Sequence, residues 1–571
     1  MSDYASHLTT IAATQREPVP GAPTVRNSAG GYSFAVDDWT RLDRFLILGA
    51  EGGSYYATER ALTRENAQAV VRCAQTDPVE AVRRIVAVSD SGRAPKNDPA
   101  VFALALVAAH ADAAGKKAAY AAVPAVCRTG THLFQFAAAS DALRGWGRGL
   151  RQAVADWYTS KSARELGYQV AKYQQRDGWG HRDLLRLAHP KSADPAIQAV
   201  LRWVTHGAAA MGPLAVRRSS LGADAVVVHP AVEADLPPAV RAAELAKRAE
   251  TEQEVARLVR EHRLVRECVP TKFLNSPAVW ETLLEDMPVA ALVRNLATLT
   301  RAGVVMPGSA GARDVAARLT DPDRLRRGRV HPLALLIALK TYAGGRGVKG
   351  GHTWPPVPEV VEALDVAFYL AFRAVEPAGK RWLLALDVSG SMEGGRVAGS
   401  PLTPREAAAA MCLVTAATEP VHHVVGFTGR GFSVTTAACT AGAWAGYPNS
   451  GAGVEPLTVS PSQRVDEVVA GVAGLPMGPT DCALPMLYAA DRGLAVDVFV
   501  VYTDNETWHG AIHPFQALRE YREKTGIPAK LVVVGMVSNG FTIADPDDAG
   551  MLDVVGFDAA APAVIADFAG Q

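Results

Sequence analysis

A carboxylate and two hydroxyls stand at alternate positions in the C-terminal third of the sequence. Asp387, Ser389 and Ser391 lie at the end of an apolar run of strand length, residues 382–388. In a turn, side chains at i, i+2 and i+4 converge on one point, and their hard oxygen atoms are ligands for Mg²⁺, or alternatively Mn²⁺, but not for a soft metal. The alternative for this motif alone is a capped turn without a metal.

Two further oxygen donors occur later in the chain, in the order that one site would need. Thr480 precedes a predicted helix, and Asp504 follows a second apolar strand-length run. Ligands in α/β sheets bind where the carboxyl ends of the strands meet, so these oxygen donors fit one metal site. Asp481 and Glu506 are near in sequence, which leaves a metal-dependent nuclease using Asp387 and Asp504 as an alternative.

Basic residues gather in two stretches of the first part of the chain. Residues 144–186 contain nine Lys or Arg and four acidic residues, and residues 324–349 contain seven Lys or Arg and no acidic residue. Six aromatic side chains occur in the first stretch, and we expect them to be mainly core. Lys and Arg neutralise phosphates, and exposed aromatic rings stack on unpaired bases. The alternative is a set of solvated surface charges.

The centre of the first basic stretch predicts a compact cluster of cations. If residues 163–175 form a helix, Lys172 and Arg176 lie one turn apart on one face. Gly178 and Gly180 would then turn the chain, so that His181 and Arg182 begin the next helix beside them. A helix start with a cation and a histidine favours phosphate binding.

Charge is divided unevenly along the 571 residues. The whole chain has 58 basic and 58 acidic residues, but the part from Lys380 to Gln571 has 11 basic and 20 acidic ones, a balance of −9 that leaves +9 for the rest. The first part therefore suits a polyanion. No apolar run reaches the ~20 residues that cross a bilayer, and no signal pattern opens the chain, so we expect a cytoplasmic protein without membrane contact. Six scattered cysteines argue against disulfides and zinc.

A change in composition and apolar pattern divides the chain into two folded domains. Up to about residue 375 the segments are rich in Ala, Leu, Arg and Glu with short breaks, which predicts a solenoid of antiparallel helix pairs. After residue 377, buried strands alternate with helices, which predicts a doubly wound parallel sheet. We therefore expect a flexible N-terminus at 1–24, a helical domain at 25–376 and an α/β domain at 377–571. The Gly-rich segment 437–461 is expected to be a surface insertion.

Several strings resemble a known family. The Asp387–Ser391 motif with Thr480 and Asp504 resembles the metal-ion-dependent adhesion site of von Willebrand A-type domains. Longer strings, in order and across both domains, are similar to the Ro ribonucleoprotein autoantigen family, whose helical part is the TROVE domain. They are NSAGGYSF at 27–34, RFLILGAEGGSYY at 44–56, VCRTGTHLF at 126–134, KYQQRDGWGHR at 172–182 and DNETW at 504–508.

This resemblance implies an α-helical ring of HEAT-like repeats closed by a von Willebrand A-type domain, with one chain forming each ring. It implies a non-catalytic protein that binds small non-coding Y-like RNA on a basic outer surface and single-stranded ends of misfolded RNA in a central hole. A 3′-to-5′ exoribonuclease such as polynucleotide phosphorylase is an implied partner. The family's RNA-contact positions correspond to Lys172, Arg176 and His181, with Arg128, His132 and Arg182 as additions.

Asp177 lies in the predicted RNA-binding loop where relatives often have Asn and Ser, and its charge would repel phosphate. The metal site would leave a coordination position for an acidic partner, so the alternative function is a protein-interaction scaffold.

Overall fold

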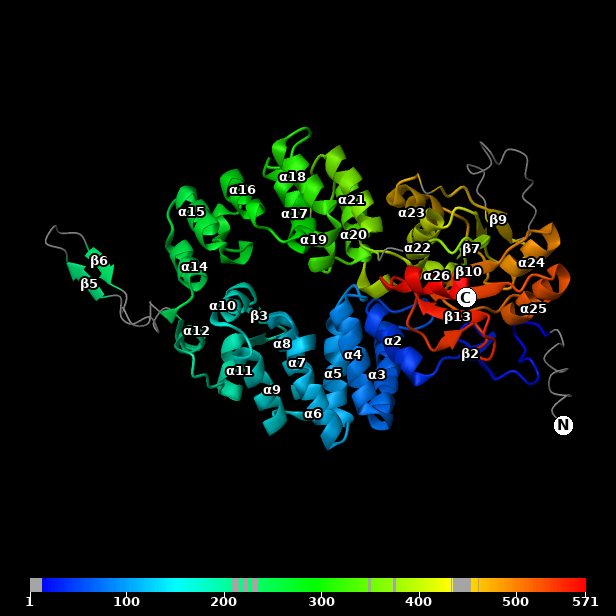
Figure 1. The fold of residues 1–571 in the computed structure, drawn as a ribbon, viewed down its shortest axis with the longest axis horizontal. Helices are drawn as coiled ribbons and strands as arrows, with labels where there is room; N and C mark the ends of the chain where they lie inside the picture. The colour runs from blue at the N-terminus through cyan, green and yellow to red at the C-terminus, as the bar shows by residue number, and fades with distance from the viewer. Residues whose placement is uncertain are drawn as a thin grey trace.

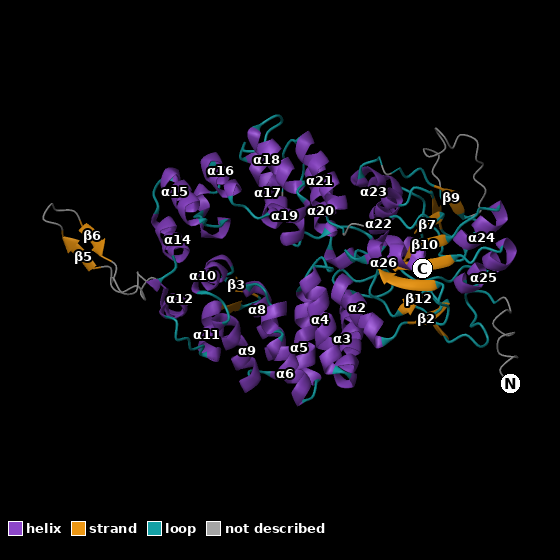
Figure 2. Ribbon diagram, viewed as in Figure 1, coloured by secondary structure: helices purple, strands orange, loops and turns teal. Residues whose placement is uncertain are grey.

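The computed structural model describes residues 13–207, 235–347, 351–372, 376–432, 434, 453–460 and 462–571, with the backbone of two short strands, β5 (Ala215–Arg218) and β6 (Asp224–Val227). Helices build the first part of the chain and the main sheet lies in the C-terminal part (Figure 2). None of the described helices is long and apolar enough to cross a membrane.

The helical domain consists of short Ala- and Leu-rich helices with polar N-caps. Thr58 and Asp77, for example, accept hydrogen bonds from the first backbone N–H groups of α3 and α4. The helices are α2 (Asp38–Leu48), α3 (Glu59–Thr76), α4 (Pro78–Ser91), α5 (Asp98–His110), α6 (Ala113–Ala121), α7 (Val123–Val126), α8 (Gly130–Arg144), α9 (Arg148–Thr159), α10 (Ala163–Lys172), α11 (His181–Ala188), α12 (Pro195–His206), α14 (Pro238–Arg248), α15 (Glu252–His262), α16 (Pro277–Glu285), α17 (Val289–Arg301), α18 (Ala310–Leu319), α19 (Pro322–Arg327), α20 (Pro332–Ala343) and α21 (Pro358–Leu370).

These helices form a ring. The chain leaves the α/β domain at α2, runs outward to α12 and returns from α14 to α20 and α21, which again lie beside that domain (Figure 1). The predicted helical ring is therefore confirmed. Two Ala- and Arg-rich segments that the sequence pattern predicts as single helices, 141–158 and 240–263, are each divided. The first breaks where Gly145 has a positive φ of 76°, and the second breaks before Thr251, which caps α15.

The second domain has the predicted doubly wound sheet. Its strand order is β13-β11-β10-β7-β8-β9, parallel except for β9. Side chains alternate between two apolar layers, since Leu384 and Leu386 face one side and Leu383 and Ala385 the other. The elements are β7 (Trp382–Asp387), α22 (Pro404–Thr418), β8 (His422–Phe427), β9 (Val454–Pro456), α23 (Val465–Ala473), α24 (Leu484–Arg492), β10 (Val498–Thr503), α25 (Pro514–Thr525), β11 (Lys530–Gly535), β13 (Met551–Val555) and α26 (Ala561–Gly570).

The prediction that residues 437–461 form a surface insertion is partly wrong. Residues 454–456 form β9, which pairs antiparallel with β8 at the sheet edge, and Val454 is buried. A short antiparallel edge strand on a parallel sheet is a common arrangement. Residues 437–452 of this segment, including Cys439, lie outside the described residues, whereas the five other cysteines are free and buried, as expected.

The N-terminal segment packs on the α/β domain, and the prediction of a flexible 1–24 is wrong for residues 13–24. Gln15 is fully buried and its Nε2 donates to Asp481 Oδ1 at 2.8 Å. β1 (Thr24–Arg26) and β2 (Tyr32–Ala35) form a hairpin that pairs with β12 (Phe541–Thr542). Residues 1–12 lie outside the described part. The hairpin therefore belongs physically to the second domain.

Three distant loops meet where the ring closes. The Arg93 guanidinium pairs with Asp558 at 2.5 Å, and the Arg93 carbonyl accepts hydrogen bonds from His331 Nε2 at 2.9 Å and Ala559 N at 3.3 Å. Arg329 donates to Asp90 at 2.8 Å. We call Arg93, Asp558 and His331 the ring junction, because they join the first helices, the last helices and the α/β domain.

Candidate metal centre and nucleic-acid interface

Four of the five predicted metal ligands lie together at the carboxyl edge of the sheet, and Thr480 is in the neighbouring loop, whose Gly478 carbonyl accepts the Gly390 N–H at 3.0 Å. Asp387 ends β7 and Asp504 follows the adjacent strand β10, so the parallel register places the two carboxylates side by side. Ser389 and Ser391 lie in the turn after β7 with their hydroxyls 3.2 Å apart. All five predicted ligands, Thr480 included, are at most 5% exposed.

Hydrogen bonds fix the Asp387 carboxylate in place. Its Oδ1 accepts the Ser389 backbone N–H at 2.9 Å, and its Oδ2 accepts the Thr503 hydroxyl at 2.7 Å. Burial and the charge of Asp387 raise the pKa of Asp504 well above its usual value, and burial also raises the pKa of Asp387. Two buried carboxylates that repel each other, with hydroxyls around them, fit a hard divalent cation.

The predicted metal centre contains more hydroxyl ligands than carboxylate ligands. Among the described residues, no group of three or more His, Cys, Asp or Glu side chains is placed to hold a metal ion. A cation here would depend on two carboxylates and the hydroxyls of Ser389, Ser391 and Thr480. Such a centre leaves coordination positions for water or for an acidic ligand.

Arg405 braces the metal-site turn, and sequence reasoning missed it. Its guanidinium is 1% exposed and donates to the carbonyls of Val388 at 2.5 Å, Ser389 at 3.3 Å and Leu475 at 2.8 Å. It also forms an ion pair with Glu393 at 3.1 Å. The signal was a single arginine in the Ala-rich segment of α22, since a cation inside such a buried helix needs nearby acceptors.

A loop of the helical domain lies over the same turn. Ser54 forms an isolated antiparallel bridge with Gly395, and an added Cβ at Gly394 would meet Tyr55 at 2.6 Å. The Tyr56 hydroxyl interacts with Ser391, and burial together with the charges of Asp504 and Glu506 raises its pKa. The centre therefore lies at a contact between the two domains, which the sequence did not indicate.

The two additional acidic residues are engaged by the N-terminal segment. Glu506 Oε2 accepts the backbone N–H groups of Ser28 at 2.7 Å and Ala29 at 3.2 Å, and Asp481 accepts Gln15. Burial raises the pKa of Asp481 to about 6. Carboxylates that hold the chain in this way are poorly placed to act as a general base.

A two-stranded hairpin organises the predicted RNA-binding cluster. α10 ends at Lys172, and β3 (Gln175–Arg176) pairs with β4 (Trp179–Gly180), so the predicted helix to residue 175 is wrong. Asp177 and Gly178 form the turn, with φ of 51° and 79°. An Asp-Gly pair favours this two-residue turn because both positions need a positive φ. The unexpected Asp177 thus has a conformational role.

Three cations of the cluster reach the surface. Lys172 donates to the Tyr168 hydroxyl at 2.8 Å and lies over the Tyr168 and Tyr173 rings. Arg176 forms a pair with Asp177 at 3.4 Å but remains 56% exposed, and Arg182 is exposed on the first turn of α11. A solvent-exposed ion pair of this kind is weak and does not prevent phosphate binding.

His181 lies in the core instead of on the surface. It is 4% exposed, packs against Phe134, Trp157 and Tyr158, and its Nδ1 is 2.7 Å from the Tyr158 hydroxyl. Burial lowers the pKa of His181 to about 4, so the ring is neutral at pH 7. Trp157 and Tyr158 are in the core, as expected, but Tyr168 is exposed and Trp146, Tyr173 and Trp179 are only partly buried, so the prediction that the six aromatics are mainly core is wrong.

Arg128 and His132 lie on the other side of α8's first turn. Arg128 donates to Ser89 Oγ at 2.6 Å, and burial lowers the pKa of His132 to about 4. Gly130 stands between them and the hairpin: an added Cβ there would lie 2.9 Å from His181 Nε2 and from Tyr173 Cβ. Four of the six predicted RNA-contact residues thus lie at the hairpin: the cations Lys172, Arg176 and Arg182 and the buried His181. Arg128 and His132 form a separate pair.

The second basic stretch is largely neutralised. Arg324 and Arg326 pair with Asp321 at 3.2 Å and Asp323 at 2.7 Å, and Lys340 pairs with Glu406 of α22. These carboxylates come from outside residues 324–349, so the sequence count overstated the available charge. Lys349 lies outside the described residues.

Comparisons with known proteins match both domains. Residues 25–342 match the TROVE domain model and residues 381–569 match the Ro60 vWA domain model. The chain is 44% identical over 551 residues to a Deinococcus radiodurans protein named RNA-binding protein RO60, covering 95% of each chain. It is 36% identical to the protein of that name from Caenorhabditis elegans, covering 95% of this chain and 90% of the other.

A solved structure extends the match to the whole fold. The crystal structure of the Deinococcus radiodurans RO (RSR) protein aligns with a TM-score of 0.65 and 43% identity, covering 94% of this chain and 99% of that one. Both domain models, the two relatives and this structure agree over nearly the full length. The chain therefore belongs to the Ro60 family of TROVE-domain proteins, of the bacterial type.

Proposed function

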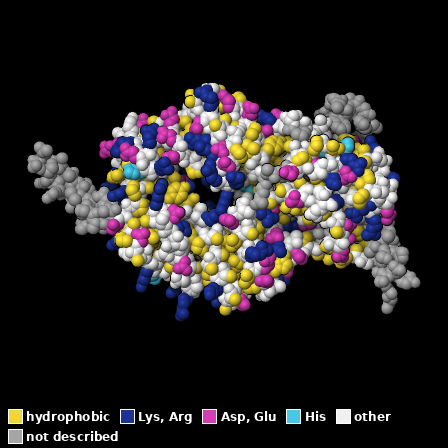
Figure 3. Space-filling model, in the orientation of Figure 1, with side chains coloured by type: hydrophobic (Ala, Val, Ile, Leu, Met, Phe, Trp, Pro, Cys, Tyr) yellow, Lys and Arg dark blue, Asp and Glu magenta, His cyan; other side chains and the backbone are white. Residues whose placement is uncertain are grey.

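We propose that this chain is an RNA-binding protein whose exposed cations at the β3–β4 hairpin contact the RNA backbone. The observation that carries the proposal is the gathering of Lys172, Arg176 and Arg182 around one hairpin, in a chain similar to proteins named RNA-binding protein RO60. Lys and Arg side chains also line the hollow in the helical ring (Figure 3). Such cations bind phosphate without reading sequence directly.

The test replaces Lys172, Arg176 and Arg182 together by Gln. We expect the affinity for a single-stranded RNA of about 30 nucleotides to fall on the order of 100-fold, because three charge-assisted phosphate contacts are lost. The slope of log K against log salt concentration should flatten by about 2. Filter binding at several salt concentrations measures both quantities.

The matched control replaces Arg257, Arg260 and Arg326 by Gln. These arginines are exposed but paired with Glu261, Glu285 and Asp323, so the net charge changes equally while the hairpin is untouched. An equal loss of affinity in the two triple variants, or binding that does not depend on salt, would contradict the proposal.

The finer proposal concerns the RNA and its fate. Small non-coding Y-like RNA would bind outside the ring and single-stranded ends of misfolded RNA would enter it, in an RNA quality-control or processing role. The protein itself would be non-catalytic, monomeric and cytoplasmic, and would present RNA to a 3′-to-5′ exoribonuclease such as polynucleotide phosphorylase. Sequencing of crosslinked RNA from the cell identifies the ligand. RNA cleavage by the pure protein, lost in Asp387→Ala, would contradict the non-catalytic role.

The same proposal assigns Mg²⁺ to Asp387, Ser389, Ser391, Thr480 and Asp504, with Mn²⁺ as the alternative. Both carboxylates have raised pKa values, so the metal-free fold loses stability as pH rises above about 4, where the unfolded state releases these protons more readily. Mg²⁺ competes with those protons. The rise in melting temperature caused by Mg²⁺ should therefore grow from pH 5 to pH 8.

The matched variant for the metal is Asp504→Asn. It removes one charge of the pair, so it should raise the melting temperature without metal and abolish the response to Mg²⁺. A Mg²⁺ response of wild-type size in this variant would exclude the assigned centre.

A second candidate function is metal-dependent adhesion. A groove of about 730 Å³ is bordered by Arg16, Phe432 and Trp508. Gly478 and Pro479, which directly precede Thr480, also line it. An acidic segment of a partner would place a carboxylate on the metal and apolar side chains in this groove. Binding of an acidic peptide that requires Mg²⁺, by protein freed of RNA, would support this role, and its persistence in Asp504→Asn would exclude it.

A further inference from the structure

A small polar cavity lies where the first and last helices of the ring meet. Its volume is about 210 Å³, and its walls come from α4, the loop before α5, the start of α8 and the loop after α19. The polar side chains in its lining are Ser89, Asn97, Arg128, His132 and Arg329, and none of the lining residues is acidic. Two cations therefore border one cavity without a carboxylate in its wall.

The two guanidinium groups are near enough to repel each other. Burial and the charge of Arg329 lower the pKa of Arg128. Arg128 is held by uncharged acceptors, Ser89 Oγ at 2.6 Å and the Ala125 carbonyl at 3.4 Å. The nearby carboxylates are Asp90, which pairs with Arg329 at 2.8 Å, and Asp98, which faces His132. An anion between the two arginines would relieve this repulsion.

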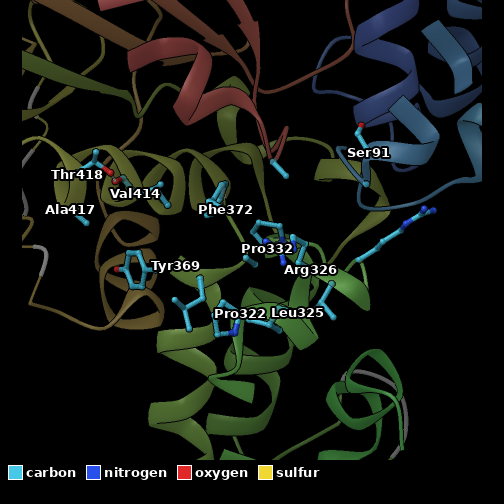
Figure 4. Close-up of a pocket in the computed structure, with 16 residues that line it drawn as sticks. Ser91, Pro322, Leu325, Arg326, Pro332, Tyr369, Phe372, Val414, Ala417 and Thr418 are labelled. Carbon is cyan, nitrogen blue, oxygen red and sulfur yellow. Dashed lines mark hydrogen bonds between the residues drawn. The ribbon is translucent and has the colours of Figure 1, made fainter. Parts of the chain in front are cut away.

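The backbone holds Arg329 in a conformation that glycine usually adopts. Its φ is +48°, and the following Val330 N–H donates to the Leu325 carbonyl at 3.0 Å, which closes the end of α19. This conformation is uncommon for a residue with a side chain. Arg329 also borders a larger, mainly apolar cavity of about 850 Å³ formed by α19, α20, α21 and α22, with Ser91 of α4 at its edge (Figure 4).

His132 adds an uncharged donor to the cavity. Asn97 Nδ2 lies 3.4 Å from His132 Nδ1, so His132 Nδ1 is the acceptor and Nε2 carries the proton. Asn97 is itself fixed by Ser89 Oγ at 2.7 Å and the Val126 carbonyl at 2.8 Å. Two guanidinium forks and a neutral imidazole N–H suit the several oxygen atoms of a phosphate better than a single carboxylate.

We propose that this cavity binds one phosphate group of an RNA, and that Arg128 from the first half of the ring and Arg329 from the last half bind it together. This inference rests on the proposed RNA binding and adds a site away from the β3–β4 hairpin. A phosphate bound here shares its charge with both halves of the ring. RNA binding thereby stabilises the closed ring.

The first experiment uses inorganic phosphate alone, so its result does not depend on whether the protein binds RNA. Phosphate should raise the melting temperature of the full-length wild-type protein, and Arg329→Gln and Arg128→Gln should each abolish most of that rise. Arg326→Gln is the matched control, because Arg326 is in α19, just before the loop that carries Arg329, and is exposed and paired with Asp323. The absence of a phosphate-dependent rise in the wild type would overturn the proposal.

Asp90→Asn separates binding from a merely structural ion pair. It removes the partner of Arg329 but keeps both cations, so phosphate should bind as tightly as in the wild type or more tightly. If Asp90→Asn loses the phosphate effect as fully as Arg329→Gln, the pair is structural and the proposal is wrong.

The second experiment uses a ten-nucleotide single-stranded RNA ending in either a 3′-hydroxyl or a 3′-phosphate. Arg329→Gln should weaken binding about tenfold and flatten the salt dependence by about 0.7. If the site takes a terminal phosphate, the 3′-phosphate RNA binds more tightly and only that advantage is lost in the variant; if it takes a backbone phosphate, both RNAs lose equally. Equal, small losses in Arg329→Gln and Arg326→Gln would overturn the proposal.

Discussion

Burial decides what the histidines near the RNA-binding cluster can do. His132 and His181 both have a pKa of about 4, because burial disfavours the charged ring. Neither supplies a positive charge to RNA at neutral pH. His181 instead joins the start of α11 to Tyr158 and the aromatic core, which places the hairpin cations. Residue type alone indicated a phosphate ligand, whereas the surroundings indicate a positioning residue.

This difference gives a prediction at the scale of the residue. From pH 7.5 to pH 5.5 both histidines stay neutral, so RNA affinity should change less than about twofold through them. A histidine that bound phosphate as a cation would instead strengthen binding as pH falls through about 6.5. Fluorescence anisotropy of labelled RNA across this range measures the profile, with His181→Gln as the comparison. A marked rise in affinity at low pH, absent in His181→Gln, would contradict this assignment.

At the scale of the element, close packing between α8 and the β3–β4 hairpin positions the cluster. Gly130 starts α8 and donates its N–H to Gln169 Oε1 at 2.9 Å. A methyl group at Gly130 would press on His181 and Tyr173 at 2.9 Å, closer than carbon atoms normally approach. The hairpin therefore depends on the absence of a side chain on the neighbouring helix.

Gly130→Ala should lower the free energy of unfolding by about 1–3 kcal/mol, since the packed His181 ring cannot move aside without cost. RNA affinity should fall as the hairpin shifts. Gly471→Ala, in α23, is the control, because an added Cβ there meets no atom within 4 Å and a helical Gly→Ala change is neutral or stabilising. Urea unfolding and RNA binding compare the two. Equal stability of the two variants would show that the close contact is not limiting.

The elements also show what sequence could and could not predict. Near-continuous apolar runs of strand length predicted β7, β8, β10 and β11. The strand ends placed Asp387 and Asp504 together, because the carboxyl ends of parallel strands lie on one edge of the sheet. The Asp177-Gly178 turn was detectable but was missed in favour of a longer helix. The burial of His181, the Arg405 brace and the Tyr56 contact depend on residues far apart in sequence, which a single sequence does not connect.

At the scale of the whole molecule, the ring junction joins the first helices, the last helices and the α/β domain through polar contacts. Arg93, at the end of α4, is bound to the α/β domain through Asp558 and to the last helices through His331. Asp558 is 4% exposed, and both of its carboxylate oxygens accept hydrogen bonds from Arg93. Charge-assisted hydrogen bonds of this kind are among the stronger polar contacts in proteins.

Asp558→Asn should lower the free energy of unfolding by about 1–3 kcal/mol, because the Arg93 guanidinium loses its charged acceptor. The ring should also open more often, which small-angle X-ray scattering detects as a larger radius of gyration. Asp323→Asn is the control, since its pair with Arg326 is exposed on both sides. A radius and a stability equal to those of the control would exclude a role for the junction in closure.

The N-terminal hairpin has a consequence for how the protein is made. β2 pairs with β12 some five hundred residues later, and Gln15 and Asn27 bind Asp481 and the Thr507 carbonyl. This segment therefore leaves the ribosome long before β12, Asp481 and Thr507, and its contacts with them form only after the α/β domain has been translated. In a nascent chain that stalls before residue 480, this segment stays exposed to proteases. Protection of the segment from proteolysis therefore indicates that the α/β domain has been translated and has folded.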